Sequence, residues 1–463
     1  MEVTASGTTG TSRRQFLRRI GGASAALVGG PSLLQLLTAC GGGTAANPNS
    51  GASPNLARGG QITLLTGEAF VPKADTVLQS LMNKWASEHH GWTVTQQTVA
   101  SADMQIKVPA EMQAQSGADI LAFSYNWAWL YESSCVDVSA QVKSLIKKNG
   151  APFYEAITTS NQVNGVWRAF PWTYGTAAWV YRKDLWGQVG KSTFVSTYDE
   201  LLSAGKQVLA KSHVPLGVSL GHASGDANIV WYPVLWAFGG QEVDKDGKTI
   251  ALDSPATLNA VEWAIEMWNA GVESHATLSW DDTGNNKAWS AHSICATVNS
   301  SSIYTNALPG GTAPDAVLAS TTGASATLSG PKGNPSMPSP TSMAVMKWSK
   351  NPGAAAELLE FLLQKENFSQ YLNADGGAIA YPNGILDDSS VWTSSPVMKA
   401  FNQGIKTSRW VGWPGPPHRA ASQAEAQYVI VDMFAKAVQS PSDRKQVVQQ
   451  AASQLQAFYS RPQ

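Results

Sequence analysis

An alternation of strand-like and helix-like segments near the start of the mature chain limits its fold more than any other feature. Residues 60–68 form a predicted strand that runs into a glycine turn, and apolar residues at helical spacing follow until Gly91. A second strand begins at Trp92, a second helix is predicted over residues 103–116, and residues 118–124 have the composition of a buried strand. This strand–helix–strand–helix–strand order predicts an α/β fold with a doubly wound sheet.

Length and composition add further limits. The chain has 463 residues, which exceeds what one hydrophobic core usually organises, and a second α/β unit follows residue 186, so two lobes are expected. The net charge is −1 and no cluster of arginine or lysine occurs beyond the N-terminal region, so nucleic acid is not an expected partner. The 18 tryptophans instead suggest surfaces that stack on a ligand.

The N-terminal region carries an export signature. Arg13 and Arg14 form a twin-arginine motif, and a weakly apolar stretch leads to Cys40, which small residues precede and glycines follow, as in a bacterial lipobox. Residues 1–39 are therefore predicted to be a twin-arginine lipoprotein signal peptide, Cys40 the lipidated residue and residues 40–58 a flexible tether. An ordinary signal peptide or a membrane anchor is the alternative, but glycines and a proline interrupt the apolar stretch. The expected location is the outer face of the cytoplasmic membrane, with the lipid as the only membrane attachment.

Two cysteines remain in the body of the chain. An oxidising location would permit a disulfide between Cys135 and Cys295, but two separate buried thiols are the simpler expectation because the sequence gives no geometry. No CxxC pair or His/Cys spacing typical of a metal site occurs, and no nucleotide-binding motif is present. Neither a metal nor a cofactor is expected.

An aromatic stretch in the middle of the chain supplies the first candidate binding residues. Residues 175–181 are predicted to form one buried strand, and a proline just before it extends the chain through a tight place. Trp172 and Tyr174, beside that proline, are predicted to face a ligand, whereas Trp179 and Tyr181 are assigned to the core. The competing interpretation places all four rings in the core.

Further candidates come from the expected sheet topology. Ligands of doubly wound sheets bind at the carboxyl ends of the strands, which predicts a cleft containing Glu68, Asn126 and Trp127. Trp127 could equally cap the sheet edge. Trp231 and Tyr232 begin an apolar helical stripe that is mostly core, but their place at its start makes them candidates for the cleft.

The ordered set of motifs resembles one known family. The segments are the lipobox, GADILAFSYNWAWLY, AFPWTYGTAAWVYRKDLW, TYDELLSAGKQV and DKDGKTIALDSPATLNAVEWAIEMW. Together they resemble the maltose-binding-protein-like solute-binding proteins of bacterial ABC sugar importers, over nearly the whole mature chain. The resemblance implies a two-lobed periplasmic-binding-protein fold of type II, with segments that cross a hinge and a sugar held between the lobes. The implied lobes are 59–170 with 326–380, and 171–325 with 381–463.

The resemblance also implies site residues and partners. Asn126, Trp172, Trp231 and Ser300 match ligand-binding positions of the family. The family often has an aromatic residue shortly after the position of Ser300, where this chain has none, and Trp410 with Trp413 could supply that ring. The implied protein is a monomer that delivers its sugar to the permease subunits of an ABC transporter.

Sugar binding has a physical basis, and alternatives stay open. An aromatic ring suits the apolar face of a sugar, and carboxylates and amides suit its hydroxyl groups. A polyamine, a peptide or a glycerol phosphate is the alternative ligand, and more carboxylates in the cleft would favour a polyamine. A glycoside hydrolase would need a carboxylate pair such as Glu68 with Asp281 or Asp282, and no other catalytic motif is present, so an enzyme is not expected. A surface adhesin or sensor with the same fold is a third class.

Overall fold

The computed structural model describes residues 56–461 with the exception of residue 224, and the observations below concern those residues. The predicted signal peptide 1–39, the lipidation site Cys40 and most of the tether 40–58 lie outside them. Within the described part of the chain, no helix has both the length and the apolar character needed to cross a bilayer.

The first sheet has six strands in the order β11-β6-β10-β3-β1-β2. Its parallel part consists of β1 (Gly60–Gly67), β2 (Trp92–Val99) and β3 (Ile120–Ser124), joined by α2 (Pro72–Glu88) and α3 (Met104–Ala114). The predicted strand–helix alternation is confirmed, and Pro109 does not divide α3. The strand β1 buries Ile62, Leu64 and Leu65 completely or nearly so, and α2 contributes Leu78, Met82 and Trp85 to the same hydrophobic cluster. These apolar contacts hold the helix on the sheet.

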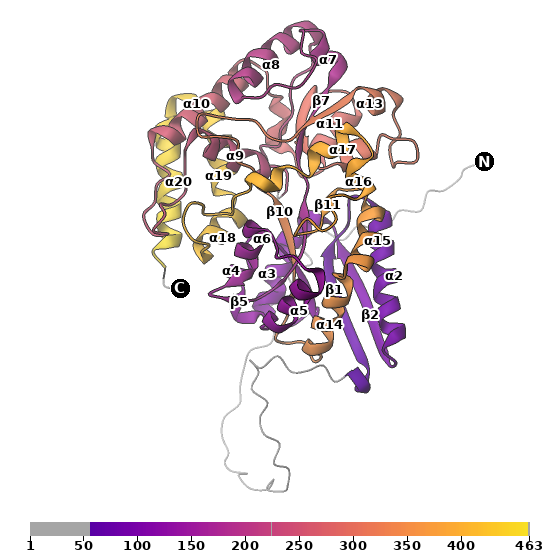
Figure 1. Cartoon of the computed structure of the whole chain (residues 1–463). Coiled ribbons are helices and arrows are strands. Elements are labelled where there is room, and N and C mark those ends of the chain that lie inside the picture. The colour runs from indigo at the N-terminus through magenta and orange to yellow at the C-terminus, as the bar shows by residue number, and fades with distance from the viewer. Residues whose placement is uncertain (1–55, 224, 462–463) are drawn as a thin grey trace, which may run out of the picture. The chain divides into compact units, whose positions relative to one another are not determined.

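The antiparallel part of this sheet comes from distant segments of the chain. The strand β10 (Ser339–Val345) lies between β3 and β6 (Phe170–Gly175), with Thr341 opposite both Ser124 and Thr173. The short β11 (Ile379–Ala380) covers the outer edge of β6. This sheet therefore combines strands from three regions of the sequence, namely residues 60–124, 170–175 and 339–380. Figure 1 labels β1, β2, β10 and β11 among them.

The predicted single strand over residues 175–181 is wrong, because the chain changes sheets within it. The strand β6 ends at Gly175, and β7 (Ala178–Arg182) begins a separate three-stranded sheet of order β8-β7-β9, with β8 (Ala296–Asn299) and β9 (Thr322–Ser325). Between β6 and β7, the Thr176 hydroxyl donates a 2.8 Å hydrogen bond to the Gly377 carbonyl. Thr176 and Ala177 thus form a crossing segment from one sheet to the other.

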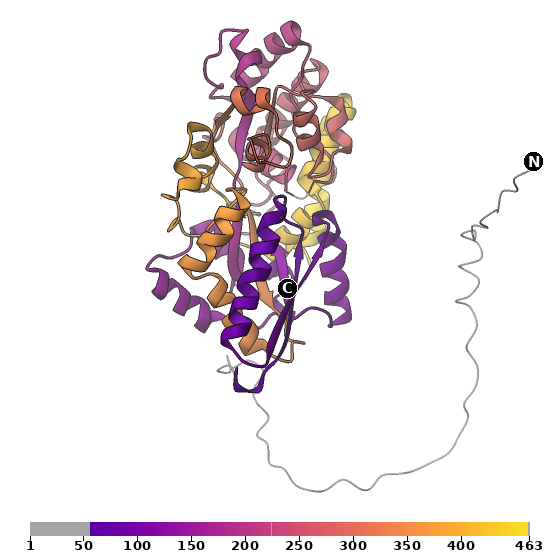
Figure 2. The same ribbon diagram turned by 90° about the vertical axis from the view of Figure 1, so that its right-hand side faces the viewer.

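The remaining elements surround these two sheets (Figures 1 and 2). Those close to the first sheet are α4 (Trp127–Leu130), α5 (Ser139–Asn149), α6 (Glu155–Asn161), β4 (Gln162–Val163), β5 (Val166–Trp167), α14 (Pro352–Leu362) and α15 (Lys365–Asp375). The helix α16 (Ser390–Thr393) packs on α17 (Pro396–Phe401), which contacts β9 of the second sheet. The others are α7 (Lys183–Gly187), α8 (Tyr198–Ser212), α9 (Asn228–Phe238), α10 (Pro255–Asn269), α11 (Gly284–Ser290), α12 (Ser302–Thr305), α13 (Ala316–Thr321), α18 (Arg419–Ala426), α19 (Val429–Gln439) and α20 (Arg444–Tyr459).

Two hydrophobic clusters form the core. The first cluster contains the six-stranded sheet together with Ala178 and Val180 of β7, and the second contains the other face of β7, part of β8 and α8, α9, α10, α19 and α20. Trp179 and Tyr181 are buried in the second cluster, so their predicted core role is confirmed. Buried residues between 381 and 405, such as Trp392 and Phe401, pack in the first cluster, whereas the sequence-based boundaries assign this segment to the second lobe. The lobe boundaries stay a prediction.

Both cysteines of the body are free and fully buried, Cys135 in the first cluster and Cys295 in the second. The expectation of two separate thiols is therefore confirmed. Burial raises the pKa of each thiol to about 12, so both are protonated at neutral pH.

Candidate functional site

A cavity of about 250 Å³ lies at the carboxyl ends of the parallel strands. Thr66 and Glu68 reach it from the end of β1, and Ser124 from the end of β3. This is the position at which doubly wound sheets bind ligands. Residues from the part of the chain that follows β7, here called the second half, complete the wall; they include Asp226, Asn299 and Ser300. The cavity is therefore shared by elements from both sheets.

Trp172 supplies an apolar surface to the cavity from β6. It is only 3% exposed and is held by the rings of Phe368 and Tyr371, whose centroids lie 5.5 and 5.4 Å from its own. Such aromatic packing fixes the orientation of the indole. Phe70 lines the same cavity but is 45% exposed, which is unusual for a ring of this size. One buried and one exposed ring thus border the same space.

Hydroxyl and amide groups line the cavity from the second half. The turn after β8 is fixed by Asn299, whose Oδ1 accepts the Ser300 N–H at 2.7 Å. The hydroxyl groups of Ser300 and Ser302 lie 2.8 Å apart and share a hydrogen bond. Hydroxyls can donate or accept, so this cluster can adapt to a ligand with hydroxyl groups of its own.

Five carboxylates line the cavity, and no described lysine, arginine or histidine is among the lining residues. The five are Glu68, Asp75, Asp226, Asp282 and Asp375. Three of them are oriented by backbone N–H groups: Asp75 accepts from Ala69, Asp282 from Gly225 and Asp226, and Asp375 from Ile379, at 2.8 to 2.9 Å. The cavity is accordingly lined by carboxylates as well as by aromatic rings.

Burial perturbs two of these carboxyl groups. Burial raises the pKa of Asp375 to about 7, although the N–H groups of Ile379 and Ala378 act in the opposite direction. Burial also raises the pKa of Asp226 well above its usual range, and the negative charge of Asp282 adds to this effect. A positive charge placed between these groups would lower both pKa values.

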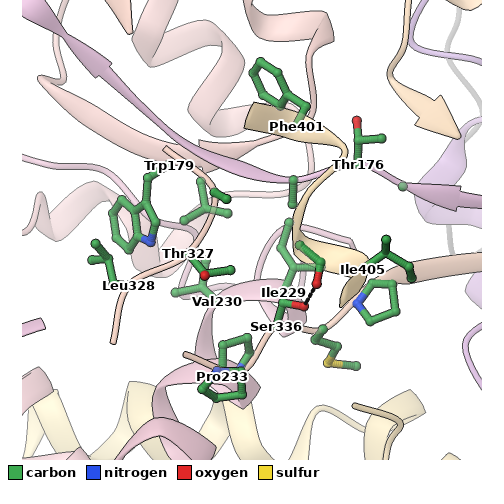
Figure 3. A pocket seen from close by; sticks show the side chains of 18 of the residues that line it. Thr176, Trp179, Ile229, Val230, Pro233, Thr327, Leu328, Ser336, Phe401 and Ile405 are labelled. Atoms are coloured by element: carbon green, nitrogen blue, oxygen red, sulfur yellow. Dashed lines mark hydrogen bonds between the residues drawn. The ribbon is translucent and has the colours of Figure 1, made fainter. Parts of the chain in front are cut away.

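A second, smaller pocket adjoins the cavity, since Gly175, Thr176 and Ile229 line both. Figure 3 shows it with Trp179, Val230 and Ile405 around it, and with Ser336 hydrogen-bonded to the Gly404 carbonyl. Its volume of about 40 Å³ is little more than that of one water molecule. This pocket is too small for a sugar ring.

The structure brings three of the ten predicted binding residues into the larger cavity, namely Glu68, Trp172 and Ser300. Tyr174 lines the smaller pocket instead, farther along β6 than Trp172 and Thr173, which line the cavity. Its hydroxyl donates to Asn402 and its ring meets the edge of Tyr154.

Trp231 and Tyr232 do not line the cavity, and the structure corrects their predicted place. Trp231 is buried in the second cluster, where its indole N–H donates to the Ser219 carbonyl at 2.8 Å and its ring packs on Phe434. The Tyr232 hydroxyl donates to the buried Glu242. The helix α9 is apolar on nearly every side, so its start is covered as thoroughly as its middle. Only Ile229 of this helix reaches the cavity.

The predicted loop residues also lie elsewhere. Asn126 is buried, with its amide donating to the Val411 carbonyl and its oxygen accepting from Ser160, so it ties the first sheet to the C-terminal segment. Trp127 packs on Phe123 and Tyr131, which agrees with the alternative of a ring that covers the sheet end.

Trp410 and Trp413 are placed by contacts within their own loop. The indole N–H of Trp410 donates to the Gly415 carbonyl at 2.9 Å. The Arg409 guanidinium lies 3.6 Å from the centroid of the Trp413 ring. A ring that already carries a cation on its face is not available for a sugar in the same place.

Sequence reasoning missed several lining residues. These residues lie in short turns or beside glycine or serine, where the sequence has no helical or strand periodicity that would single them out. They are Phe70, Asp226, Asn299 and Asp375. Asp375 could have been singled out as the last residue before a glycine pair, and Phe70 as an aromatic residue directly after the first strand end. The others depend on which distant segments meet, which the sequence does not state.

Comparison with known proteins gives a family and a fold. A model of the family described as bacterial extracellular solute-binding protein matches residues 80–400. A curated binding protein of Brucella abortus (strain 2308) is 22% identical over 223 residues, which are 48% of this chain. That match covers 53% of the relative, so the chain spans about half the length of the curated relatives it matches.

Solved structures share the architecture. Maltose-bound MalE3 of T. maritima has a TM-score of 0.71 and 17% identity, over 86% of this chain and 99% of that one. A solute-binding protein of an ABC transporter from Thermotoga lettingae TMO, bound with α-D-tagatose, has a TM-score of 0.73 and 14% identity, over 86% and 100% of the two chains. These similarities confirm the expected two-lobed periplasmic-binding-protein fold.

Proposed function

The chain belongs to the family of bacterial extracellular solute-binding proteins, and from that premise we propose that it captures a sugar in the cavity beside Trp172 and delivers it to an ABC importer. The single observation that carries the proposal is the pairing of aromatic rings with hydroxyl and carboxylate groups around one cavity of about 250 Å³. The permease subunits of the importer are the proposed protein partner, and the binding protein is proposed to act as a monomer.

The chemistry of the cavity supports a sugar. Trp172 and Phe70 offer flat apolar faces to the C–H groups of a sugar ring, and Glu68, Ser300 and Asn299 offer partners for its hydroxyl groups. Solved proteins of the same fold carry maltose or tagatose. The crossing segment at Thr176 and Ala177 borders the cavity, so a change of angle between the two sheets would open or close it.

A thermal-shift screen of mono- and disaccharides tests this proposal. We expect at least one sugar, at 100 times its dissociation constant, to stabilise the native state by about 2.7 kcal/mol and to raise the melting temperature by about 2 °C or more. Calorimetric titration of each hit supplies the affinity, and chromatography of the mixture checks for cleaved oligosaccharide. A full panel without any shift contradicts the proposal, and hydrolysis would assign a catalytic role to Glu68 and Asp282 instead.

One observation favours a second candidate ligand. Five carboxylates around one cavity also suit a polyamine, and none of the lining residues is basic. Spermidine therefore belongs in the screen. Stabilisation by spermidine alone would replace the sugar with a cationic solute. A glycerol phosphate is disfavoured by the same charges.

We also propose that the protein is tethered outside the cytoplasmic membrane by a lipid on Cys40, after export through a twin-arginine signal. The motif of Arg13 and Arg14 and the small residues before Cys40 support this. In a bacterial host, Cys40→Ser is expected to move the protein from the membrane fraction to the soluble fraction. An unchanged membrane fraction on immunoblots would refute the lipid anchor.

A further inference from the structure

The charges around the cavity are unbalanced. Glu68, Asp75, Asp226 and Asp375 form no ion pair with a described lysine, arginine or histidine, although ion pairs occur elsewhere in the same part of the chain. Together with Asp282, they converge on one partly enclosed space from five different segments. Carboxyl groups gathered in a cleft with apolar walls favour a positive charge, although burial raises the pKa of Asp226 and of Asp375 and so opposes their ionisation.

The five carboxylates differ in their hydrogen-bond partners, and these differences indicate which of them could bind a positive charge. Asp75 is already occupied, because its two oxygens accept from Ala69 N–H and from the Gln96 amide, each at 2.9 Å. Asp226 differs: its Oδ2 is shielded from solvent and meets no donor at ordinary hydrogen-bond geometry among the described residues, and the nearby Asn285 side chain only partly offsets the effect of burial on its pKa. Burial disfavours the charged forms of both Asp226 and Asp375. Both would gain from a cation.

We propose that the sugar bound in this cavity carries a protonated amino group, which Asp226, Asp282 and Asp375 recognise. This inference rests on the proposed function, and it narrows the ligand to aminated saccharides. Neutral sugars lack the charge that would compensate these carboxylates, and acidic or phosphorylated sugars would add to the repulsion. The aromatic side at Trp172 would still hold the ring of the sugar.

Matched pairs of ligands test the proposal. Calorimetric titrations at pH 7 would compare glucosamine with glucose and N-acetylglucosamine, galactosamine with galactose, and the chitosan disaccharide with cellobiose. We expect the amino member of at least one pair to bind ten-fold or more tightly than its neutral counterparts. Equal or tighter binding of the neutral sugars would overturn the inference and leave the proposed function intact. Binding of spermidine with no binding of any sugar would overturn both.

Variants locate the recognised charge. Asp226→Asn and Asp375→Asn keep the shape of each side chain, and each is expected to reduce the preference for the amino sugar over its neutral counterpart at least five-fold. Asp199→Asn is the matched control, because Asp199 is exposed on α8 and lies outside the cavity. An undiminished preference in both cavity variants would overturn the assignment, and melting temperatures would verify that each variant is folded.

Discussion

Trp172→Ala is expected to weaken sugar binding by at least ten-fold, which corresponds to about 1.4 kcal/mol of binding free energy. The indole of Trp172 lines the cavity and is held in place by Phe368 and Tyr371, so the part of it that reaches the cavity needs no reorganisation when a sugar contacts it. A large, prepositioned aromatic side chain at the centre of a binding site commonly carries a large share of the affinity. Calorimetric titration with the tightest sugar of the screen measures the loss.

Two companion variants separate lost binding from lost packing. Trp231→Phe changes a tryptophan that is equally buried, 3% exposed in both cases, but that lies in the second hydrophobic cluster away from the cavity. It should retain affinity within about two-fold. Phe70→Ala removes the exposed ring at the cavity and should weaken binding without lowering the melting temperature. Full affinity in both Trp172→Ala and Phe70→Ala would remove the aromatic side from the site.

Trp186→Ala is expected to cause the largest loss of stability, about 3 to 5 kcal/mol of unfolding free energy. Trp186 is fully buried, its indole N–H donates to the Cys295 carbonyl, and its ring packs on Phe194 at 4.7 Å between centroids. Truncation would leave a cavity in the second cluster and remove the indole hydrogen bond to the Cys295 carbonyl, which would keep only its bond from the Arg182 N–H. Chemical unfolding followed by circular dichroism gives the free energy.

The reference for this prediction is Phe70→Ala, because the same kind of truncation at a 45% exposed ring removes little buried surface. Its unfolding free energy should stay within about 0.5 kcal/mol of the wild type. A Trp186→Ala loss below about 1.5 kcal/mol would mean that the second cluster is packed more loosely than its contacts indicate.

The parallel part of the first sheet could be predicted from the sequence because local signals coincide there. In β1 the buried positions around Leu64 are apolar, a helix with a clear apolar face follows, and Gly91 ends the turn into β2. Trp179 and Tyr181 were assigned to the core for the same reason. Hydrophobic pattern and local propensity agree at these positions, so no tertiary information is required.

The rest depends on contacts between distant segments. The change of sheets at Thr176 is invisible in a continuous apolar run, since it reflects pairing with β10 in one sheet and with β8 and β9 in the other. The cavity combines Glu68, Asp226, Ser300 and Asp375, which are separated by 74 residues or more along the chain. Trp231 shows the converse problem, because a tryptophan at the start of an apolar helix has the same sequence pattern whether a ligand or Phe434 covers it.

The central claim is that one cavity, formed at the strand ends of the first sheet and completed from the second half, holds the solute. A crystal structure of the protein grown with its tightest sugar tests this most directly. We predict density for the sugar against the ring of Trp172, within hydrogen-bond distance of Ser300 and of at least one of Asp226, Asp282 and Asp375. Density for the sugar at any other place, with the cavity filled only by water, would contradict the account.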